Sequence, residues 1–147
     1  MNRAKEIKNI FYFFLGISIF ISGEVIGSQR DLKKLQLIGD CPNCSLEKAN
    51  LSYKNLEGVN LGEADLREAN LKGANLRQAN LKKVNLSGAD LTGANLSGAY
   101  LKYANLKGAD LYGANLHFAQ VQMADLYGAN LREADLSSAQ LNGSDLR

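Results

Sequence analysis

From residue 46 to residue 146, every fifth position is a leucine, except for Val121, and no insertion breaks the period. An α-helix would turn successive leucines by about 140°, and a strand would send them to opposite faces. If five residues instead form a short side and a corner, every leucine points at one axis and four sides close a coil of 20 residues. The pattern therefore predicts an all-β solenoid in which residues 20 apart stack at about one strand spacing, ~4.8 Å.

The other four positions of the unit agree with this geometry. A small apolar residue stands two places before most leucines and suits a second inward position. Asn or Asp precedes most leucines, and we expect these side chains at a corner, bonded to neighbouring backbone groups. Glycine is frequent two places after the leucine, where it permits positive φ and a type II turn. Type I-like turns are expected in the units with larger residues at that place, namely Gln78, Lys83, Tyr103, Phe118 and Met123.

The run ADLREANLKGANLRQANL resembles the A(D/N)LXX signature of pentapeptide-repeat proteins, and the resemblance extends over 21 consecutive units. It implies the family's right-handed quadrilateral β-helix, here of about five coils over residues 44–147. It implies little about chemistry, because fold and function are separable. Some members of the family resemble B-form DNA and protect DNA gyrase from quinolones. This coil carries 11 Lys plus Arg and 11 Asp plus Glu, whereas a DNA mimic needs strong negative charge.

Residues 1–27 lie outside the repeat and have the pattern of a secretory signal peptide. Arg3, Lys5 and Lys8 precede a mostly apolar, uncharged run over residues 9–23, and residues tolerated at cleavage sites end at Gly27. Cleavage after Gly27 would place the exported protein outside the cytoplasm, in a periplasm or a lumen. The alternative is an uncleaved N-terminal segment that anchors the protein in a membrane.

Residues 28–43 connect this segment to the coil. Leucine and isoleucine among charged residues predict a short amphipathic helix that ends at Gly39 and caps the first coil. The run LQLIGDCPNCSLEKANL resembles the entry sequence of many cyanobacterial pentapeptide-repeat proteins, in which a CPxC element follows a leucine-rich helix. This resemblance implies a cyanobacterial-type source and a location in a periplasm or a thylakoid lumen. Just beyond, Lys54 replaces the small inward residue two places before Leu56. Its side chain either extends outward or marks a locally irregular first coil, and we expect the irregularity.

Cys41 and Cys44 allow several interpretations. A zinc site would need two further ligands, and the sole histidine, His117, lies some four coils away. A thioredoxin-like redox pair would need an α/β scaffold that the sequence lacks. A structural disulfide fits an oxidising compartment, and a reduced Cys44 fits the inward position that alanine fills elsewhere. The residues leave the last two interpretations open.

The repeat contains no recognisable catalytic machinery, so we expect no enzyme activity, no cofactor and no metal. His117 occupies an outward position, the aspartates share the place of asparagines, and no phosphate loop or nucleophile motif is present. We expect an exported, rigid module that is structural or binds a protein. A regulator that acts by surface mimicry of a macromolecule is the alternative, and a redox-active cysteine pair is a weaker one.

Departures from the repeat mark a candidate interaction surface. On the side that contains Leu101 and Val121, Tyr100 and Gln120 replace the usual Asn or Asp. Exposed aromatic residues and methionine beside lysines are typical of recognition surfaces. The predicted patch consists of Tyr100, Tyr103, Phe118, Met123, Lys82, Lys83 and Lys102.

Charge is also unevenly distributed along the coil. Residues 72–107 contain six basic residues and one acidic residue, Asp90, a net charge of +5. This basic waist predicts contact with an acidic protein or, weakly, with an anionic membrane surface, whereas nucleic acid is not expected as a partner. The repeat continues to Arg147, and an unpaired coil edge there predicts a homodimer through the C-terminal coil.

Overall fold

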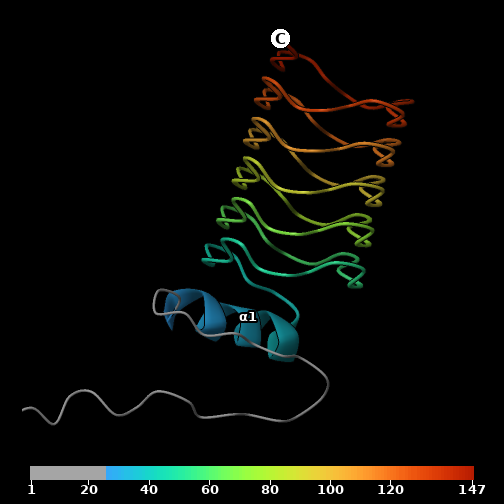
Figure 1. Ribbon diagram of the computed structural model, residues 1–147. Coiled ribbons are helices and arrows are strands. Elements are labelled where there is room, and N and C mark those ends of the chain that lie inside the picture. The colour runs from blue at the N-terminus through green and yellow to red at the C-terminus, as the bar shows by residue number, and fades with distance from the viewer. Residues whose placement is uncertain (1–25) are drawn as a thin grey trace, which may run out of the picture.

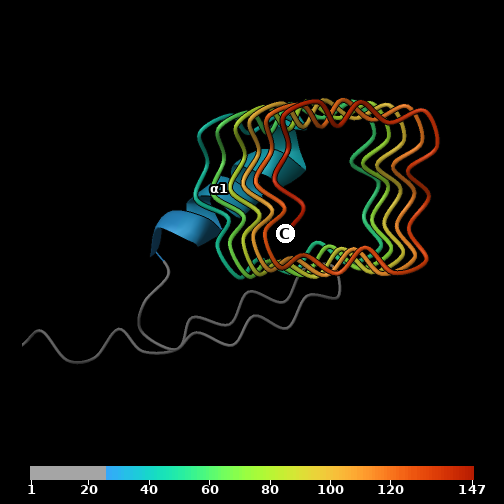
Figure 2. The same ribbon diagram turned by 90° about the horizontal axis from the view of Figure 1, so that it is seen from above.

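The computed structural model describes residues 26–147. One helix, α1, spans Ile26–Ile38 and is followed by a stack of coils (Figure 1). Seen along the axis of the stack, each coil has four sides (Figure 2). Within the described residues no helix is long and apolar enough to cross a membrane. Residues 1–25, which make up most of the expected signal peptide, lie outside the described part of the chain.

The sides of the coil are held by single bridging residues, and residues 26–147 contain no longer strand. Every bridge is parallel and joins residues 20 apart, as Asp90 joins Asp110. The bridging residue is the one before each leucine, so it lies in the middle of a side and not at a corner as expected. The two residues after the leucine form the corner. Four columns of bridging residues define the sides: side A begins at Ser45, side B at Asn50, side C at Asn55 and side D at Asn60.

Backbone hydrogen bonds repeat with the unit. Leu91 N donates to Asp110 O of the next coil at 2.7 Å, and Asp110 N donates to Ala89 O at 2.9 Å. Ala94 N donates to Leu91 O at 2.9 Å and closes the turn. Asp110 Oδ1 also accepts from Tyr112 N at 3.0 Å. The expectation that Asn and Asp side chains bond backbone groups of a corner is therefore confirmed, although the residues themselves stand on the sides.

All corners share the left-handed conformation at their second residue. There φ is +61° at Gly73, but it is also +56° at Gln78 and +64° at Tyr103. The expected type I-like turns are therefore wrong. A left-handed conformation costs a residue other than glycine ~1 kcal/mol. In exchange, Tyr103 N donates to Gln122 O of the next coil at 3.0 Å, so the ladder between coils continues through the corner.

Stacked leucines form the core. The leucines from Leu61 to Leu111 have no exposed surface. Alanines such as Ala94 occupy the second inward position and have no exposed surface either. Each buried leucine contributes about 1.5 to 3 kcal/mol before conformational entropy is subtracted. Burial decreases toward the C-terminal end, where Leu131, Leu136 and Leu141 are only partly buried.

Helix α1 covers the N-terminal end of the core. Leu35 is buried, and Leu32 packs against the same cluster. The helix stops before Gly39 as expected, because Gly39 has a φ of +85° and donates its N–H to Leu35 O at 2.9 Å. It begins at Ile26, two residues earlier than the expected segment, so that cleavage after Gly27 would fall within its first turn.

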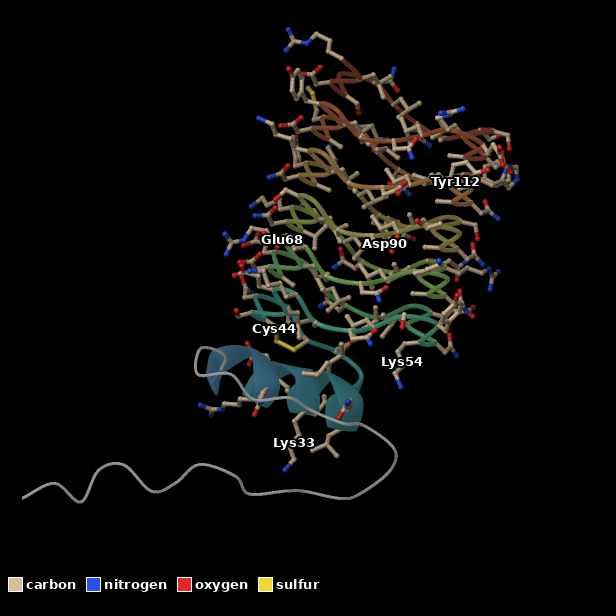
Figure 3. The ribbon with its side chains drawn as sticks, viewed as in Figure 1. Lys33, Cys44, Lys54, Glu68, Asp90 and Tyr112 are labelled. Carbon is tan, nitrogen blue, oxygen red and sulfur yellow. A yellow bond between two sulfur atoms is a disulfide. The ribbon has the colours of Figure 1, made fainter. Side chains whose placement is uncertain are left out.

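The backbone of the first coil is regular at Lys54. Asn55 bridges Asn75, and Asn75 N donates to Lys54 O at 2.9 Å, as in the other units. The Lys54 side chain is exposed and points away from the stack at its N-terminal end (Figure 3). The expected irregularity is therefore wrong. Because no coil of the described chain lies beneath side C, a long side chain can extend from this position into solvent.

Ion pairs join the first coil to the second. Arg77 Nη1 lies 2.6 Å from Glu57 Oε1, and Lys83 Nζ lies 3.0 Å from Glu63 Oε1. Both pairs connect corner residues 20 apart. Each is exposed, so each contributes little to stability by itself. Two of the six cations of the basic waist are therefore neutralised by the coil below.

A further cluster surrounds Arg67. Its Nη2 lies 3.0 Å from Glu47 Oε2 and 2.8 Å from Asp65 Oδ2. The hydrogen bond from the Arg67 side chain lowers the pKa of the Asp65 carboxyl below its usual 3.8, against a smaller opposing effect of burial. Asp65 is thus a group whose charge is linked to folding.

The buried leucines predict a large difference between the middle and the end of the stack. Replacing Leu91, which has no exposed surface, by alanine should lower the free energy of unfolding by about 2 to 5 kcal/mol, since it leaves a cavity. Leu146→Ala removes a side chain that is 53% exposed and should cost about 1 kcal/mol or less. Urea unfolding followed by circular dichroism measures both. Equal losses would contradict a core formed by stacked leucines.

The lowered pKa of Asp65 predicts a pH dependence. Its contribution to stability is present above the usual value of 3.8 and is lost as the pH falls through the lower value of the folded state. Asp65→Asn should therefore reduce the urea midpoint at neutral pH and make the loss of stability below pH 3.8 shallower. The control is Asp110→Asn, because Asp110 forms hydrogen bonds but no ion pair in the described chain. The same acid profile for both variants would argue against the Arg67 linkage.

Candidate interaction surface

The structure brings the predicted patch together on side D. Tyr100 stands in the bridging column of this side, between Asn80 and Gln120. Tyr103 and Met123 follow at the corner between sides D and A, and Phe118 lies at the corner between sides C and D. The patch therefore occupies one side of the coil and the two corners that border it.

The apolar members of the patch are exposed. Tyr100 is 45% exposed and Tyr103 is 48% exposed. Phe118 and Met123 are more exposed still, at 61% and 58%. Met123 lies along the corner toward the last coil, because a Cβ atom on Gly143 would come within 2.5 Å of its Sδ atom. Glycine at position 143 thus leaves room for the methionine side chain.

The three predicted lysines differ in their surroundings. Lys102 Nζ lies 5.2 Å from the centroid of the Tyr103 ring, a cation–π distance. Lys83 is paired with Glu63 of the coil below and adds no net charge to the patch. Lys82 is exposed and has no ion-pair partner among residues 26–147. Lys82 and Lys102 therefore supply the positive charge at this corner.

Three further exposed tyrosines lie on the opposite side of the coil: Tyr53 in the first coil, and Tyr112 and Tyr127 further along the stack. Tyr112 and Tyr127 occupy the corners that border side B, and Lys107 Nζ lies 5.1 Å from the Tyr127 ring centroid. A hydrogen bond to the Glu133 carboxylate of the next coil raises the pKa of Tyr112. Sequence reasoning missed these residues because it searched for replaced Asn and Asp. Tyr112 and Tyr127 each follow a leucine directly, at the first residue of a corner. That position faces outward in every unit, and it is the signal by which the sequence could have revealed them.

His117 has neighbours that its sequence context did not reveal. Its Nδ1 atom lies 2.7 Å from Ser137 Oγ, one coil later, and its ring centroid lies 4.1 Å from that of Phe118, with the two ring planes tilted by 59°. The Ser137 hydroxyl donates to Asp135 and lowers the pKa of that carboxyl. In a Ser-His-Asp triad the carboxylate must orient the imidazole. Here it contacts the serine, so this exposed cluster lacks the arrangement of a hydrolase.

The two cysteines form a buried disulfide beneath the coil (Figure 3). Cys41 and Cys44 are 0% and 3% exposed. Cys41 Sγ lies 3.3 Å from Asp31 O of α1, and Cys41 N donates to Asn60 O at 2.8 Å. The bond therefore stands where the helix meets the first coil. No group of three or more metal-binding side chains occurs in the described part of the chain.

A family model described as Pentapeptide repeats matches residues 44–82, 79–117 and 110–147, with eight copies. The chain belongs to the pentapeptide repeat family. The resemblance inferred from the A(D/N)LXX units is confirmed. No curated protein matches the chain by sequence.

Several solved structures of pentapeptide repeat proteins are similar. Rfr23 from the cyanobacterium Cyanothece 51142 is 31% identical, with a TM-score of 0.64, over 81% of this chain and 99% of that one. QnrB1, a plasmid-mediated fluoroquinolone resistance protein, is 22% identical, with a TM-score of 0.54, over 71% and 64% of the two chains. A protein from the thylakoid lumen of Arabidopsis thaliana is 27% identical, with a TM-score of 0.38, over 73% and 61%. The likeness to Rfr23 supports the family, and the likeness to QnrB1 shows the fold.

The position of the disulfide predicts a local effect of its removal. Closing a loop of four residues contributes about 2 kcal/mol in the chain-entropy model. Changing Cys41 and Cys44 together to alanine should speed amide exchange at the entry segment, where Asn43 N donates to Gly62 O at 2.9 Å. Exchange in the middle coils, for example at Leu91 N, should not change. Uniformly faster exchange would show that the bond stabilises the whole stack.

Proposed function

We propose that this pentapeptide repeat protein is an exported, non-enzymatic module that binds another protein through side D. Its scaffold is the family's right-handed quadrilateral β-helix. Export rests on the basic, apolar and cleavage-site pattern of residues 1–27 and favours a periplasm or a thylakoid lumen. The observation that carries the proposal is the exposed apolar cluster of side D.

The fold does not require an aromatic side chain at position 100. Tyr100 bridges its neighbours in the same way as Asn95 does on side C, although the two side chains differ. Asparagine at position 100 would therefore satisfy the fold while exposing less apolar surface. Tyrosine, methionine and arginine are enriched where proteins bind one another, and exposed apolar patches mark such surfaces.

The rigidity of the coil favours this use. The corner that carries Tyr103 is held by backbone hydrogen bonds on both sides, from Tyr103 N to Gln122 O and from Lys83 N to Lys102 O, both 3.0 Å. Binding therefore orders few backbone groups, which lowers the entropic cost of association. Lys82 and Lys102 at the edge of the patch favour a partner with an apolar centre and an acidic rim.

Surface mimicry remains the second candidate. A regulator of this kind would present side D as a copy of a partner's natural ligand. QnrB1 is a resistance protein by name, but the likeness to it shows the fold alone. Mimicry of DNA is disfavoured because the coil has no net charge. A redox function is disfavoured by the burial of both bonded cysteines.

Charge placed within the patch tests the proposal. Tyr103→Asp with Met123→Asp should abolish capture of a stoichiometric protein partner from the exported fraction of the source cell, because two carboxylates would be desolvated at the interface. Partners are identified by mass spectrometry, and the thermal midpoint of each variant is measured beside the unaltered protein.

The matched control changes exposed aromatic residues on the opposite side. Tyr112→Asp with Tyr127→Asp adds the same charge to corners that border side B and should leave capture unchanged. Loss of the partner with both double variants, or with neither, would contradict recognition by side D. A complex lost only with the control pair would move the interface to side B.

A further inference from the structure

The N-terminal end of the stack has an unusual distribution of charge. This end, called the base here, consists of the outer surface of α1 and the free edge of the first coil. Leu32 and Leu35 of α1 turn toward the core, so its opposite face is turned to solvent. Its surface is separate from the patch on side D, and it takes no part in the proposed function.

The carboxylates near α1 are directed into the coil. Asp31 Oδ2 accepts from Ser45 N at 2.8 Å, and Asp40 Oδ1 accepts from Asn60 N at 2.8 Å. Each replaces the carbonyl that a preceding coil would supply, since the residue before a leucine normally donates its N–H to the coil below. The two carboxylates of residues 29–43 therefore cap sides A and D and do not face away from the stack.

The carboxylates of the first coil are also occupied. Glu57 pairs with Arg77 and Glu63 with Lys83, both in the second coil. Glu47 lies near Arg67 and Lys48. Every carboxylate of residues 29–63 thus has a partner on the coil. Asp31 and Asp40 keep their negative charge but direct it into the coil, and no carboxylate of residues 29–63 forms an ion pair with Arg30, Lys33, Lys34 or Lys54.

Cations remain exposed there. Arg30, Lys33 and Lys34 lie on the exposed face of α1 and have no ion-pair partner within residues 26–147. Lys33 of the helix and Lys54 of the first coil both point away from the stack at this end (Figure 3). Four cations therefore face outward without an ion-pair partner among residues 26–147, whereas the two nearby carboxylates, Asp31 and Asp40, are directed into the coil.

Apolar side chains accompany these cations. Leu37 is 75% exposed and Ile38 is 69% exposed, both in the last turn of α1. Cations beside exposed leucine and isoleucine are the composition of helices that lie at the surface of anionic membranes. An acidic protein surface would account for the charges, but not for the two exposed aliphatic side chains beside them.

We propose that the base docks on an anionic lipid bilayer. Leu37 and Ile38 enter the interfacial region, and the four cations contact the phosphates of the headgroups. The coils then extend away from the surface, and side D stays accessible. The sequence predicted a membrane contact at the basic waist, and this proposal places it at the base instead. The reason is that the cations of the base lie at one end of the molecule, whereas those of the waist are distributed over several corners.

Tryptophan fluorescence tests this placement, because the sequence contains no Trp. The full chain carrying Leu37→Trp is reconstituted with vesicles of phosphatidylcholine and phosphatidylglycerol whose acyl chains are brominated. Docking predicts a blue shift and strong quenching of the emission of the introduced tryptophan, and both effects should disappear in vesicles of phosphatidylcholine alone. The control, Tyr112→Trp, should show neither. Equal quenching in both vesicle types would reflect only the N-terminal apolar run and would overturn the proposal, as would no quenching in either.

Charge reversal distinguishes docking by the base from a general electrostatic attraction of the whole protein to an anionic surface. Lys33→Glu, Lys34→Glu and Lys54→Glu together, in the Leu37→Trp chain, should lower the ratio of docked to undocked chains at least about 100-fold, since each cation near an anionic surface is worth about fivefold. Lys72→Glu, Lys107→Glu and Arg132→Glu make the same charge change on exposed corner residues elsewhere and should have little effect. Equal losses in both triple variants would refute docking by the base. Because all these residues lie outside side D, partner capture can fail while docking succeeds, or the reverse.

Discussion

Convergence of one leucine from every five residues upon a common axis is the constraint on which this structure depends. A leucine column is buried only if each unit ends in a corner and the next coil lies directly above. This requirement sets the spacing of 20 residues between neighbours, the parallel bridges and the conformation of the corners. It is strong enough to hold Tyr103 and Gln78 at positive φ, because leaving that conformation would break the hydrogen bonds to the next coil.

A spacing of 20 residues also organises the surface. Side chains that are remote in sequence become neighbours along the axis, and their chemistry depends on the residue one coil away. Glu57 with Arg77 and His117 with Ser137 are two such pairs. Individually these exposed contacts are weak. Together they favour one register, since a shift of a corner by one unit would place these side chains against different partners.

Because the core and ladder are uniform, functional differences between parts of the stack come from outward residues. Side D offers exposed aromatic residues and methionine on a rigid side, which suits a protein surface. The base offers cations and two exposed aliphatic side chains, which suits a charged bilayer. The two regions lie at different levels of the stack, so a membrane-docked chain could present side D to a partner.

The leucine period by itself determined the coil, its core and its outward positions, and the A(D/N)LXX units identified the family. Gly39 also marked the end of α1. These features follow from local order along the chain, where each residue has one place in a repeating unit. The tertiary structure decided which charges remain free: Lys83 is paired with Glu63, Lys54 extends from a regular coil, and Asp31 turns inward to cap Ser45. Sequence reasoning could not settle these points, because a side chain's direction depends on what the neighbouring coil offers and on whether such a coil is present at all.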